Sequence, residues 1–251
     1  MVAAMSEFQL VTENIARLEL PFKVADLFSA TVAVWLVRGQ EGFVLIDSGP
    51  PQTAGDMVEA VSEATNGKGP TLVLLTHGHL NHAGGLSALR LAWNPPIAAH
   101  VHEAPYIIGG RDYSRIRSDN PLYWLGSILM EPTPWSIPNV SRINQGQTIL
   151  GLSVIHLPGH TPGHLGFIHM KDRACICGDA VMHMRRRLMA PFILTTPNPK
   201  MAKNSIFRLT ERNFEHLLPS HGPPILKVGR QRLFEFAKKR AGKKVPPKKK
   251  S

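Results

Sequence analysis

The stretch VLLTHGHLNHAGG, residues 73–85, decides how the rest of the chain is interpreted. An apolar run ends at Thr76, and four polar side chains follow within the next six positions, namely His77, His79, Asn81 and His82. The apolar spacing of residues 86–93 is typical of a helix. We therefore expect a buried strand, a turn and a helix, with the polar cluster at the carboxyl end of the strand.

The three histidines of this stretch favour a metal site. His77 and His79 are two positions apart, so in extended backbone their rings project to the same side. A single histidine near the end of a strand is usually solvated or satisfied by a hydrogen bond. Three of them within six residues are better explained by metal binding, because imidazole is the commonest protein ligand of zinc and similar divalent ions.

Strands and helices alternate along most of the chain, which predicts an α/β architecture with helices packed on a sheet. The helix that we expect before the histidine stretch covers residues 52–63. The expected strands are residues 15–20, 31–37, 43–46, 71–75, 96–101 and 152–157, followed by a hairpin of residues 166–170 and 173–177.

Length and composition suit one large domain without a membrane span. The chain has 251 residues, 43% of them hydrophobic, and no apolar run approaches the ~20 residues that a bilayer requires. The first 20 residues lack the basic and apolar segments of a secretory signal. Cys175 and Cys177 are expected on one face of a strand, where they would be buried thiols, so we predict a cytoplasmic location.

The net charge of +11 is concentrated at the end of the chain. Residues 238–251 contain eight Lys or Arg and no acid, and the chain without them carries only +3. We therefore divide the chain into a single domain, residues 1–237, and a basic flexible tail, residues 238–251. The simplest role of the tail is to keep the protein in solution, and non-specific attraction to nucleic acid is the alternative.

Residues 103–140 form a long insertion rich in aromatic and bulky apolar side chains. Loops of this length are usually functional lids or disordered, and this one is too apolar to be disordered. We interpret it as a lid over the metal site, with Tyr106, Tyr123 and Trp124 lining an apolar substrate pocket. The alternative is a pair of helices packed on the core or on a second subunit. Packing on a second subunit would make the protein a homodimer.

Four further segments each place a polar residue after an apolar strand. They are the Asp47-Ser48-Gly49 turn, the Pro-Gly-His-Thr-Pro-Gly-His segment of residues 158–164, Gly178-Asp179-Ala180 and Ser220-His221-Gly222. Together with residues 77–82, in this order, they resemble the metallo-β-lactamase-fold hydrolases, whose signature is H-x-H-x-D-H. The resemblance covers nearly the whole chain and implies an αββα sandwich of two mixed sheets flanked by helices.

The resemblance also implies a centre with two divalent metal ions, zinc first, with manganese or iron as alternatives. One ion would be bound by His77, His79 and His160, and Asp179 would bridge both ions. The second ion would lie among Asn81, His82 and His221. Asp47 and His164 would support the ligands from behind, and His183 would belong to the substrate pocket.

The function implied by the resemblance is hydrolysis of a small molecule. A hydroxide held by the metal ions would cleave an ester, lactone, thioester or amide with a hydrophobic portion, and Asn81 and Asp179 would be the catalytic side chains. No G-x-S-x-G segment suggests a serine nucleophile instead. The alternatives are β-lactamase-type amide hydrolysis, a weakly catalytic metal-binding protein, and a nuclease or phosphodiesterase, which the run Arg185-Arg186-Arg187 would favour.

Asn81 departs from the family signature, which has aspartate at this position. An amide oxygen is a weaker, neutral ligand, and the NH₂ group can only donate hydrogen bonds. We therefore expect weaker binding of the second ion and slower turnover. Our interpretation is a substitution made to reduce turnover, and the alternative is a natural protein with an unusual second metal position.

Overall fold

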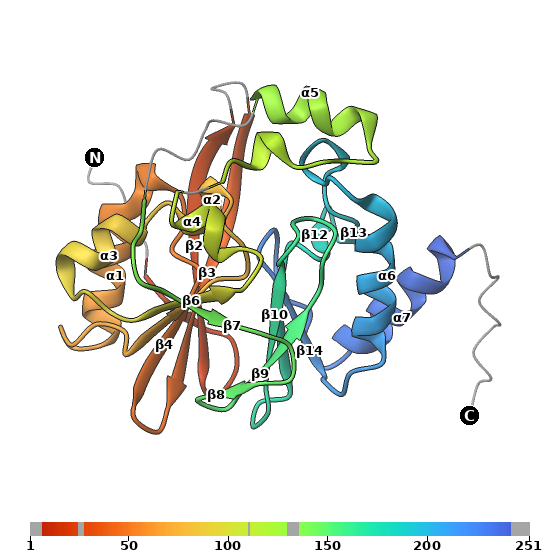
Figure 1. The fold of residues 1–251 in the computed structure, drawn as a ribbon. Helices are drawn as coiled ribbons and strands as arrows, with labels where there is room; N and C mark the ends of the chain where they lie inside the picture. Colours follow the sequence, from red (N-terminus) through yellow and green to blue (C-terminus); the bar gives the residue numbers. More distant parts are fainter. Residues whose placement is uncertain (1–6, 25–27, 110, 130–135, 242–251) are drawn as a thin grey trace, which may run out of the picture.

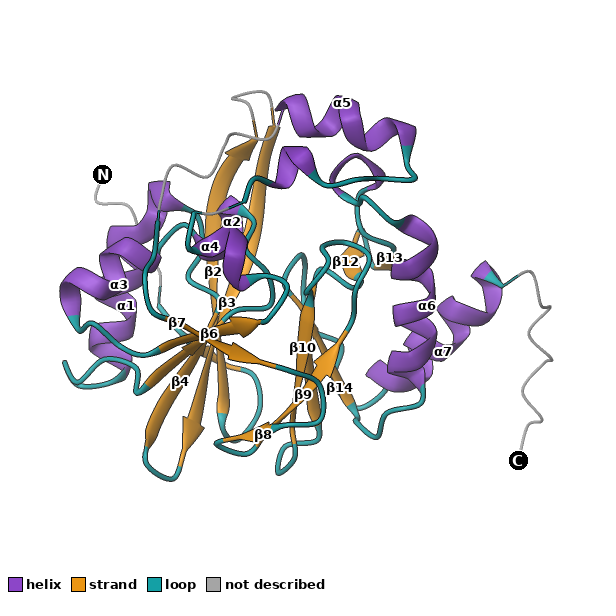
Figure 2. Cartoon of the chain, viewed as in Figure 1, coloured by secondary structure: helices purple, strands orange, loops and turns teal. Residues whose placement is uncertain are grey.

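Two facing β-sheets covered by helices on their outer faces make up the molecule (Figure 1). The computed structural model describes residues 7–24, 28–109, 111–129 and 136–241. This is the αββα sandwich expected from the sequence, and Figure 2 shows how its helices and strands separate into layers.

The first sheet has seven strands that lie side by side in chain order. The strands are β1 (Gln9–Leu10), β2 (Ile15–Val24), β3 (Phe28–Gly39), β4 (Gly42–Ile46), β5 (Leu72–Leu74), β6 (Ile97–His100) and β7 (Val140–Ile143). The pairs from β1 to β4 are antiparallel and those from β4 to β7 are parallel. A tight turn between Gly39 and Gly42 joins β3 to β4.

The second sheet has five strands in the order β14-β11-β10-β9-β8. Their bounds are β8 (Thr148–Ile149), β9 (Leu152–His156), β10 (Leu165–His169), β11 (Ala174–Gly178) and β14 (His216–Pro219). The hairpin expected in this part of the chain is the antiparallel pair β10 and β11. A separate small hairpin, β12 (Met182–Met184) with β13 (Arg187–Met189), follows β11 and was not expected.

The helices of the first half are α1 (Ala54–Ala64), α2 (Leu80–Ala83), α3 (Leu86–Ala92), α4 (Ala104–Ile107) and α5 (Pro121–Leu129), with 3-10 turns η1 (Pro51–Thr53) and η2 (Tyr113–Arg115). In the second half they are α6 (Pro199–Thr210) and α7 (Gly229–Arg240), with the 3-10 turn η3 (Ile193–Thr195). Helices α1 and α3 cover the outer face of the first sheet, α6 and α7 cover that of the second, and α5 lies across the upper end of the molecule (Figure 1).

Three buried apolar clusters hold these layers together. Met57 of α1 and Leu86 of α3 pack on the outer face of the first sheet. Trp35 and Phe167 belong to the cluster between the two sheets. Leu233 of α7 belongs to the third cluster, on the outer face of the second sheet. Fully burying a side chain of this size stabilises the fold by about 1.5–3 kcal/mol, so the sandwich is held mainly by these contacts.

The cysteines lie where the sequence placed them, and the first three residues of the expected basic tail, 238–240, are helical. Cys175 and Cys177 are buried free thiols on β11, both in the cluster under α6 and α7. Helix α7 continues through Arg240, so the first residues of the expected tail are helical, and residues 242–251 lie outside the described part of the chain. No helix among the described residues is both long and apolar enough to cross a membrane.

Candidate metal centre

Five loops bring polar side chains together, and each loop follows a strand. Asp47 comes directly after β4, and the segment from His77 to His82 lies between β5 and α3. His160 follows β9, Asp179 follows β11 and His221 follows β14. The first two loops come from the first sheet and the other three from the second. The cluster therefore joins segments that are far apart in the sequence.

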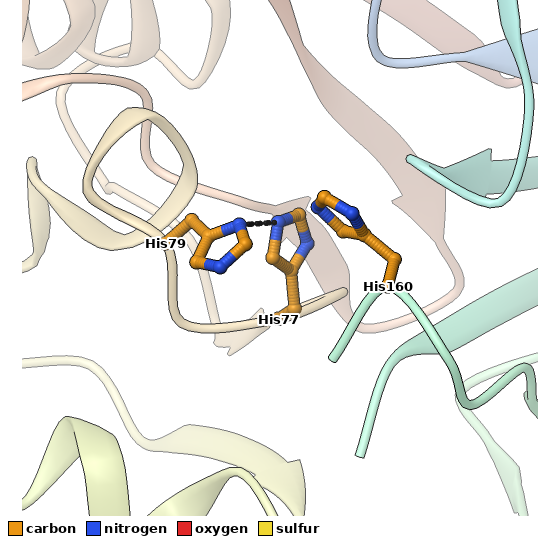
Figure 3. A group of neighbouring side chains, drawn as sticks. All are labelled: His77, His79 and His160. Carbon is orange, nitrogen blue, oxygen red and sulfur yellow. Dashed lines mark hydrogen bonds between the residues drawn. The ribbon is translucent and has the colours of Figure 1, made fainter. Parts of the chain in front are cut away.

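His77, His79 and His160 form one group of converging imidazoles (Figure 3). Nε2 of His77 lies 3.1 Å from Nδ1 of His79, and the ring of His160 is centred 4.8 Å from each of the other two. One nitrogen from each residue lies within 4.8 Å of the others, and all three side chains are buried. Such a set can hold a single divalent cation.

Asp179 lies at the centre of the remaining side chains. Its carboxylate is 3.4 Å from Nε2 of His82, 3.5 Å from Nε2 of His160 and 3.3 Å from Nε2 of His221. His77, His82 and Asp179 form a second group with metal-binding geometry. The Asp179 carboxylate is therefore next to imidazoles of both expected metal positions.

Several of the inward-facing atoms have no hydrogen-bond partner. Among the described residues, these buried orphans include Nε2 of His82, Nε2 of His160 and Oδ1 of Asp179. An unpaired buried polar atom costs about 1–3 kcal/mol, so native proteins rarely leave one without a role. Lone pairs directed at one common volume fit the donor set of a divalent cation.

The other nitrogen of each imidazole is held from behind. Nδ1 of His82 lies 2.8 Å from the Asp47 carboxylate, and Nδ1 of His221 lies 2.7 Å from the backbone oxygen of Thr31. With these oxygens as acceptors, the rings carry their proton on Nδ1 and present the Nε2 lone pair to the cluster.

Threonine hydroxyls support the remaining two rings. Nδ1 of His77 lies 3.1 Å from the hydroxyl of Thr76, which itself donates to Asp47. Nδ1 of His160 lies 3.1 Å from the hydroxyl of Thr196. Asp47 thus positions His82 directly and His77 through Thr76, and the support of metal ligands that the family resemblance implied for it stays a prediction. The two threonines had no distinguishing pattern in the sequence.

His164 supports Asp179 through the backbone. Its Nε2 accepts a hydrogen bond of 3.0 Å from the Asp179 backbone N–H, which fixes the start of the loop that carries the carboxylate. The other ring nitrogen is buried without a partner among the described residues. His164 therefore lies behind Asp179, and its support of a metal ligand stays a prediction.

Asn81 reaches the cluster from the side of His221. Its amide nitrogen lies 3.4 Å from Nε2 of His221, the atom that would bind the second cation. An NH₂ group can only donate, so in this orientation it competes with a cation for the His221 lone pair. The geometry therefore gives a physical reason for a weak second metal position.

Burial keeps most of these imidazoles neutral. Burial, with neighbouring imidazoles, lowers the pKa of His77 and of His160 well below the usual value. The same causes lower the pKa of His79 to about 3, and burial lowers that of His164 to about 3. Neutral rings offer lone pairs, which is the form that metal binding requires.

The carboxylates act in the opposite sense on His82. Burial alone would lower its pKa, but Asp179 and Asp47 raise it to about 10. Burial opposes ionisation of Asp179, yet His221 and His82 hold the pKa of its carboxyl well below the usual value. A cation bound beside Asp179 would therefore have to displace the second proton of the His82 ring.

Glu103 is a residue that the sequence did not single out. It is fully buried after β6, and its carboxylate accepts hydrogen bonds from the backbone N–H of Gly78 (3.0 Å), from that of Gly163 (2.7 Å) and from the hydroxyl of Tyr113. Gly78 lies between His77 and His79, and Gly163 precedes His164. Glu103 thus ties together the loops that carry both sets of histidines.

The four expected pocket residues have different surroundings. Tyr106 stacks on Tyr113 at a centroid distance of 4.3 Å, and the buried Tyr123 donates its hydroxyl to the Tyr113 backbone oxygen. The ring next to the metal cluster is that of Tyr113, centred 4.8 Å from His79. Trp124 is exposed on α5, and His183 is buried against Pro223, so the role of these four in substrate binding stays a prediction.

Comparison with known proteins agrees with this geometry. The sequence model of one protein family, the metallo-beta-lactamase superfamily, matches residues 30–222 of this chain. The probable metallo-hydrolase YflN of Bacillus subtilis (strain 168) is 31% identical over 217 residues, which cover 78% of this chain and 81% of that protein. The acyl-coenzyme A thioesterase MBLAC2 of Homo sapiens is 26% identical over 228 residues, which cover 81% of this chain and 76% of that protein.

Solved structures share the fold. The di-iron-bound form of TTHA1623 superposes with a TM-score of 0.63 at 26% identity, covering 85% of this chain and 98% of that one. The mono-zinc form of the metallo-beta-lactamase FIM-1 from Pseudomonas aeruginosa superposes with a TM-score of 0.69 at 14% identity, covering 95% of this chain and 97% of that one. The first was solved with iron and the second with zinc, so the shared fold does not select a metal.

Proposed function

This chain belongs to the metallo-beta-lactamase superfamily and is a metal-dependent hydrolase, and on that basis we propose that it cleaves acyl thioesters or esters with an apolar acyl group. The proposal rests on an exposed apolar surface that is linked to the metal cluster through Thr196 and His160. Zinc is the metal that we propose, with iron or manganese as alternatives, and Cys175 and Cys177 as buried free thiols support the prediction of a cytoplasmic location.

The apolar surface is formed by α5 and η3, which pack against each other. Its exposed side chains are Leu122, Trp124, Leu125, Phe192, Ile193 and Leu194. We call this set the apolar wall. It is linked to the metal cluster from behind, because the hydroxyl of Thr196, which follows η3, lies 3.1 Å from Nδ1 of His160. Exposed apolar side chains gathered in one place are typical of a surface that binds an apolar ligand.

The chain's own residues would divide the work of hydrolysis. His77, His79 and His160 would hold one cation, and His82 and His221, with Asp179 between the two positions, would hold the other. When bound, two divalent cations supply an electrophile for the acyl carbonyl and lower the pKa of a water molecule from 15.7 toward about 7.

Asp179 and Asn81 would orient the attacking water. The carboxylate of Asp179 can accept a hydrogen bond from this water while it remains next to three imidazoles. The carbonyl oxygen of Asn81 can also accept a hydrogen bond, but an amide cannot take up the proton. We therefore propose that turnover is slow compared with that of an otherwise identical protein with aspartate at this position.

The acyl part of the proposal is supported by a relative. MBLAC2 is an acyl-coenzyme A thioesterase and aligns with most of this chain. A thioester joins an apolar acyl chain to a polar carrier, and the apolar wall offers a surface for the first of these two parts. Hydrolysis would add one water molecule to the carbonyl carbon, break the C–S bond and release a carboxylic acid and a free thiol.

The test is the dependence of hydrolysis on acyl chain length. The zinc-, iron- or manganese-loaded protein is assayed with coenzyme A thioesters of two to sixteen carbons, and we expect kcat/KM to rise with chain length. The double variant Leu125→Ser/Phe192→Ser should lower kcat/KM for long chains on the order of 10-fold and leave the acetyl thioester unaffected. Leu91→Ser is the control, because Leu91 is 89% exposed on α3, on the outer face of the first sheet.

Two results would refute the proposal. One is the absence of hydrolysis with every metal and chain length, and the other is an equal loss for short and long chains in the double variant. A metal-binding protein with little catalysis is the second candidate, and the position of the Asn81 amide nitrogen near His221 favours it.

A further inference from the structure

The hairpin of β12 and β13 is attached directly to the metal cluster. It begins at Met182, three residues after Asp179. The backbone N–H of His183 donates to the His221 backbone oxygen at 2.9 Å. Gly222 approaches His183 so closely that a Cβ on it would lie 1.8 Å from the His183 oxygen. The hairpin and the His221 loop therefore form one packed unit.

Two arginines occupy the turn of this hairpin in an unfavourable backbone conformation. Arg185 and Arg186 connect Met184 to Arg187 and have φ angles of 48° and 63°. Two consecutive left-handed residues make a turn for which Asn-Gly is preferred, because a Cβ is disfavoured there. Strain of this kind persists where the surrounding structure enforces it, and it occurs most often at functional positions.

The turn is enforced by Arg232 of α7. The Nη2 atom of Arg232 donates to the Arg186 backbone oxygen at 3.1 Å and lies 3.4 Å from Nε2 of His183. Nδ1 of His183 lies 2.7 Å from the Pro223 backbone oxygen, so this ring donates there and accepts from Arg232. The hairpin is thereby fixed on α7, and its outer end is presented to solvent.

The hairpin ends in three exposed guanidinium groups. Arg185, Arg186 and Arg187 are all exposed, and within the part of the chain that the structure describes none of them forms an ion pair. Arg185 is two residues from His183, roughly 7 Å along the strand, so the positive charge lies close to the His221 loop. Guanidinium groups bind phosphate oxygens in pairs of parallel hydrogen bonds.

We propose that this arginine hairpin, residues 182–189, binds the phosphate groups of a phosphorylated thiol carrier, the leaving group of the thioester. The inference rests on the proposed function and names the other end of its substrate. The apolar wall would contact the acyl chain and the metal cluster would bind the carbonyl group. Arg185, Arg186 and Arg187 would bind the phosphates. Figure 1 shows β12 and β13 beside the upper end of the second sheet, below α5.

The experiment uses a variant that should fold at least as well as the wild type. Arg185→Asn/Arg186→Gly/Arg187→Gln removes the three charges and gives the turn its preferred residues. Arg142→Gln, an exposed arginine on β7, is the matched control. The same acyl group is offered on coenzyme A and on N-acetylcysteamine, which has no phosphate.

For the triple variant we expect KM for the coenzyme A ester to rise on the order of 10-fold, with kcat unchanged. KM for the N-acetylcysteamine ester should stay unchanged, and the melting temperature of the variant should not fall. Added salt should raise the wild-type KM for the coenzyme A ester only. An unchanged KM for the coenzyme A ester, or an equal change for both esters, would overturn the proposal.

Direct binding separates this proposal from the proposed function. Adenosine 3′,5′-bisphosphate is titrated calorimetrically into wild type and triple variant, whether or not either hydrolyses a thioester. Binding to the wild type that is lost in the variant supports the hairpin site even if hydrolysis fails. The proposal would be overturned if the bisphosphate does not bind the wild type, or if it binds wild type and variant equally. It would also be overturned if the wild type binds RNA more tightly than the bisphosphate and the variant loses this binding, because the hairpin would then be a nucleic-acid site.

Discussion

Asn81 decides the charge of the second metal position. Replacing aspartate by asparagine removes one negative charge and leaves an amide nitrogen 3.4 Å from Nε2 of His221. Asp179 is then the one carboxylate that the described residues direct into this volume together with His82 and His221. A cation in this position would be held by fewer anionic ligands than the signature of the family provides.

We predict that Asn81→Asp strengthens this position. Affinity for the second cation and kcat for thioester hydrolysis should each rise on the order of 10–100-fold, because a ligand charge is restored and the competing NH₂ is removed. Metal stoichiometry after dialysis and steady-state kinetics measure the two effects. Asn94→Asp, at an exposed position, adds the same charge elsewhere. If Asn81→Asp changes neither quantity, the amide is a natural ligand of this site.

Glu103 acts on the ligands through the backbone. Its single carboxylate accepts from Gly78 and Gly163, so the His77–His79 and His160–His164 segments are held at a fixed separation. Burial raises its pKa, and hydrogen bonds from Tyr113 and from the backbone of Gly163 and Gly78 oppose this shift.

We predict that Glu103→Gln lowers metal affinity as well as stability. An amide NH₂ opposite backbone N–H groups loses an acceptor and leaves a buried donor unpaired, a cost of about 1–3 kcal/mol in unfolding free energy. Zinc affinity should fall on the order of 10-fold, measured by competition with a chromophoric chelator. Glu63→Gln, exposed on α1, is the control. A lower melting temperature with unchanged zinc affinity would make Glu103 a purely structural residue.

At the level of secondary structure, the sequence was informative wherever an apolar strand ended in a polar residue. Asp47, His160, Asp179 and His221 all follow strands, and parallel strands carry their carboxyl ends to one edge. The division of the strands into two sheets came from the family resemblance, and their order within each sheet was not predicted, because local periodicity does not state which strands pair. The contact of Glu103 with Gly78 and Gly163 was also invisible, since it joins residues 25 and 60 positions apart.

Other elements were missed because their local signals are weak or misleading. The hairpin of β12 and β13 has three-residue strands and Arg185-Arg186 at a turn where Asn-Gly would have been recognised. In α7, Gly229, Leu233 and Ala237 are the buried residues and charged side chains are frequent, so no helix was expected there and residues 238–240 were assigned to the tail. Tertiary contacts, not intrinsic preference, determine both elements.

The contact between α5 and η3 couples the apolar wall to the metal cluster. Gly126 of α5 is so close to η3 that a Cβ would lie 1.9 Å from the Leu194 backbone oxygen. Any larger residue must push α5 and η3 apart. Because Thr196, just after η3, contacts His160, a displacement of η3 should also disturb this ligand.

We therefore predict opposite effects for two Gly→Ala changes in helices. Gly126→Ala should destabilise the fold by about 1–3 kcal/mol through overpacking and should lower activity on long-chain thioesters. Gly55→Ala in α1 meets no atom within 4 Å and should stabilise by about 0.5–1 kcal/mol without affecting activity. Urea unfolding and chain-length kinetics measure both. Equal stability effects of the two changes would show that α5 can move away from η3 without cost.

For the whole molecule, the proposed ligands cross the boundary between the two halves. His77, His79 and His82 come from loops of the first sheet, and His160, Asp179 and His221 come from loops of the second. The apolar contacts between the sheets hold the halves together over most of their area. At the edge where the loops meet, the inward-facing side chains are polar and several buried atoms lack hydrogen-bond partners among the described residues.

We predict that bound metal ions hold the loops of the two sheets together at this edge, and that removing the metal lowers the free energy of unfolding. A ligand that binds only the folded state at about 1,000 times its Kd stabilises by about 4 kcal/mol, so chelation should reduce the melting temperature by many degrees and abolish hydrolysis. Addition of zinc should restore both, and His216→Ala, a change on β14 away from the cluster, should leave this response intact. Calorimetry with parallel metal analysis provides the measurement. If the metal is lost and the melting temperature stays the same, the apolar contacts alone hold the sheets together, and the cations serve only the chemistry.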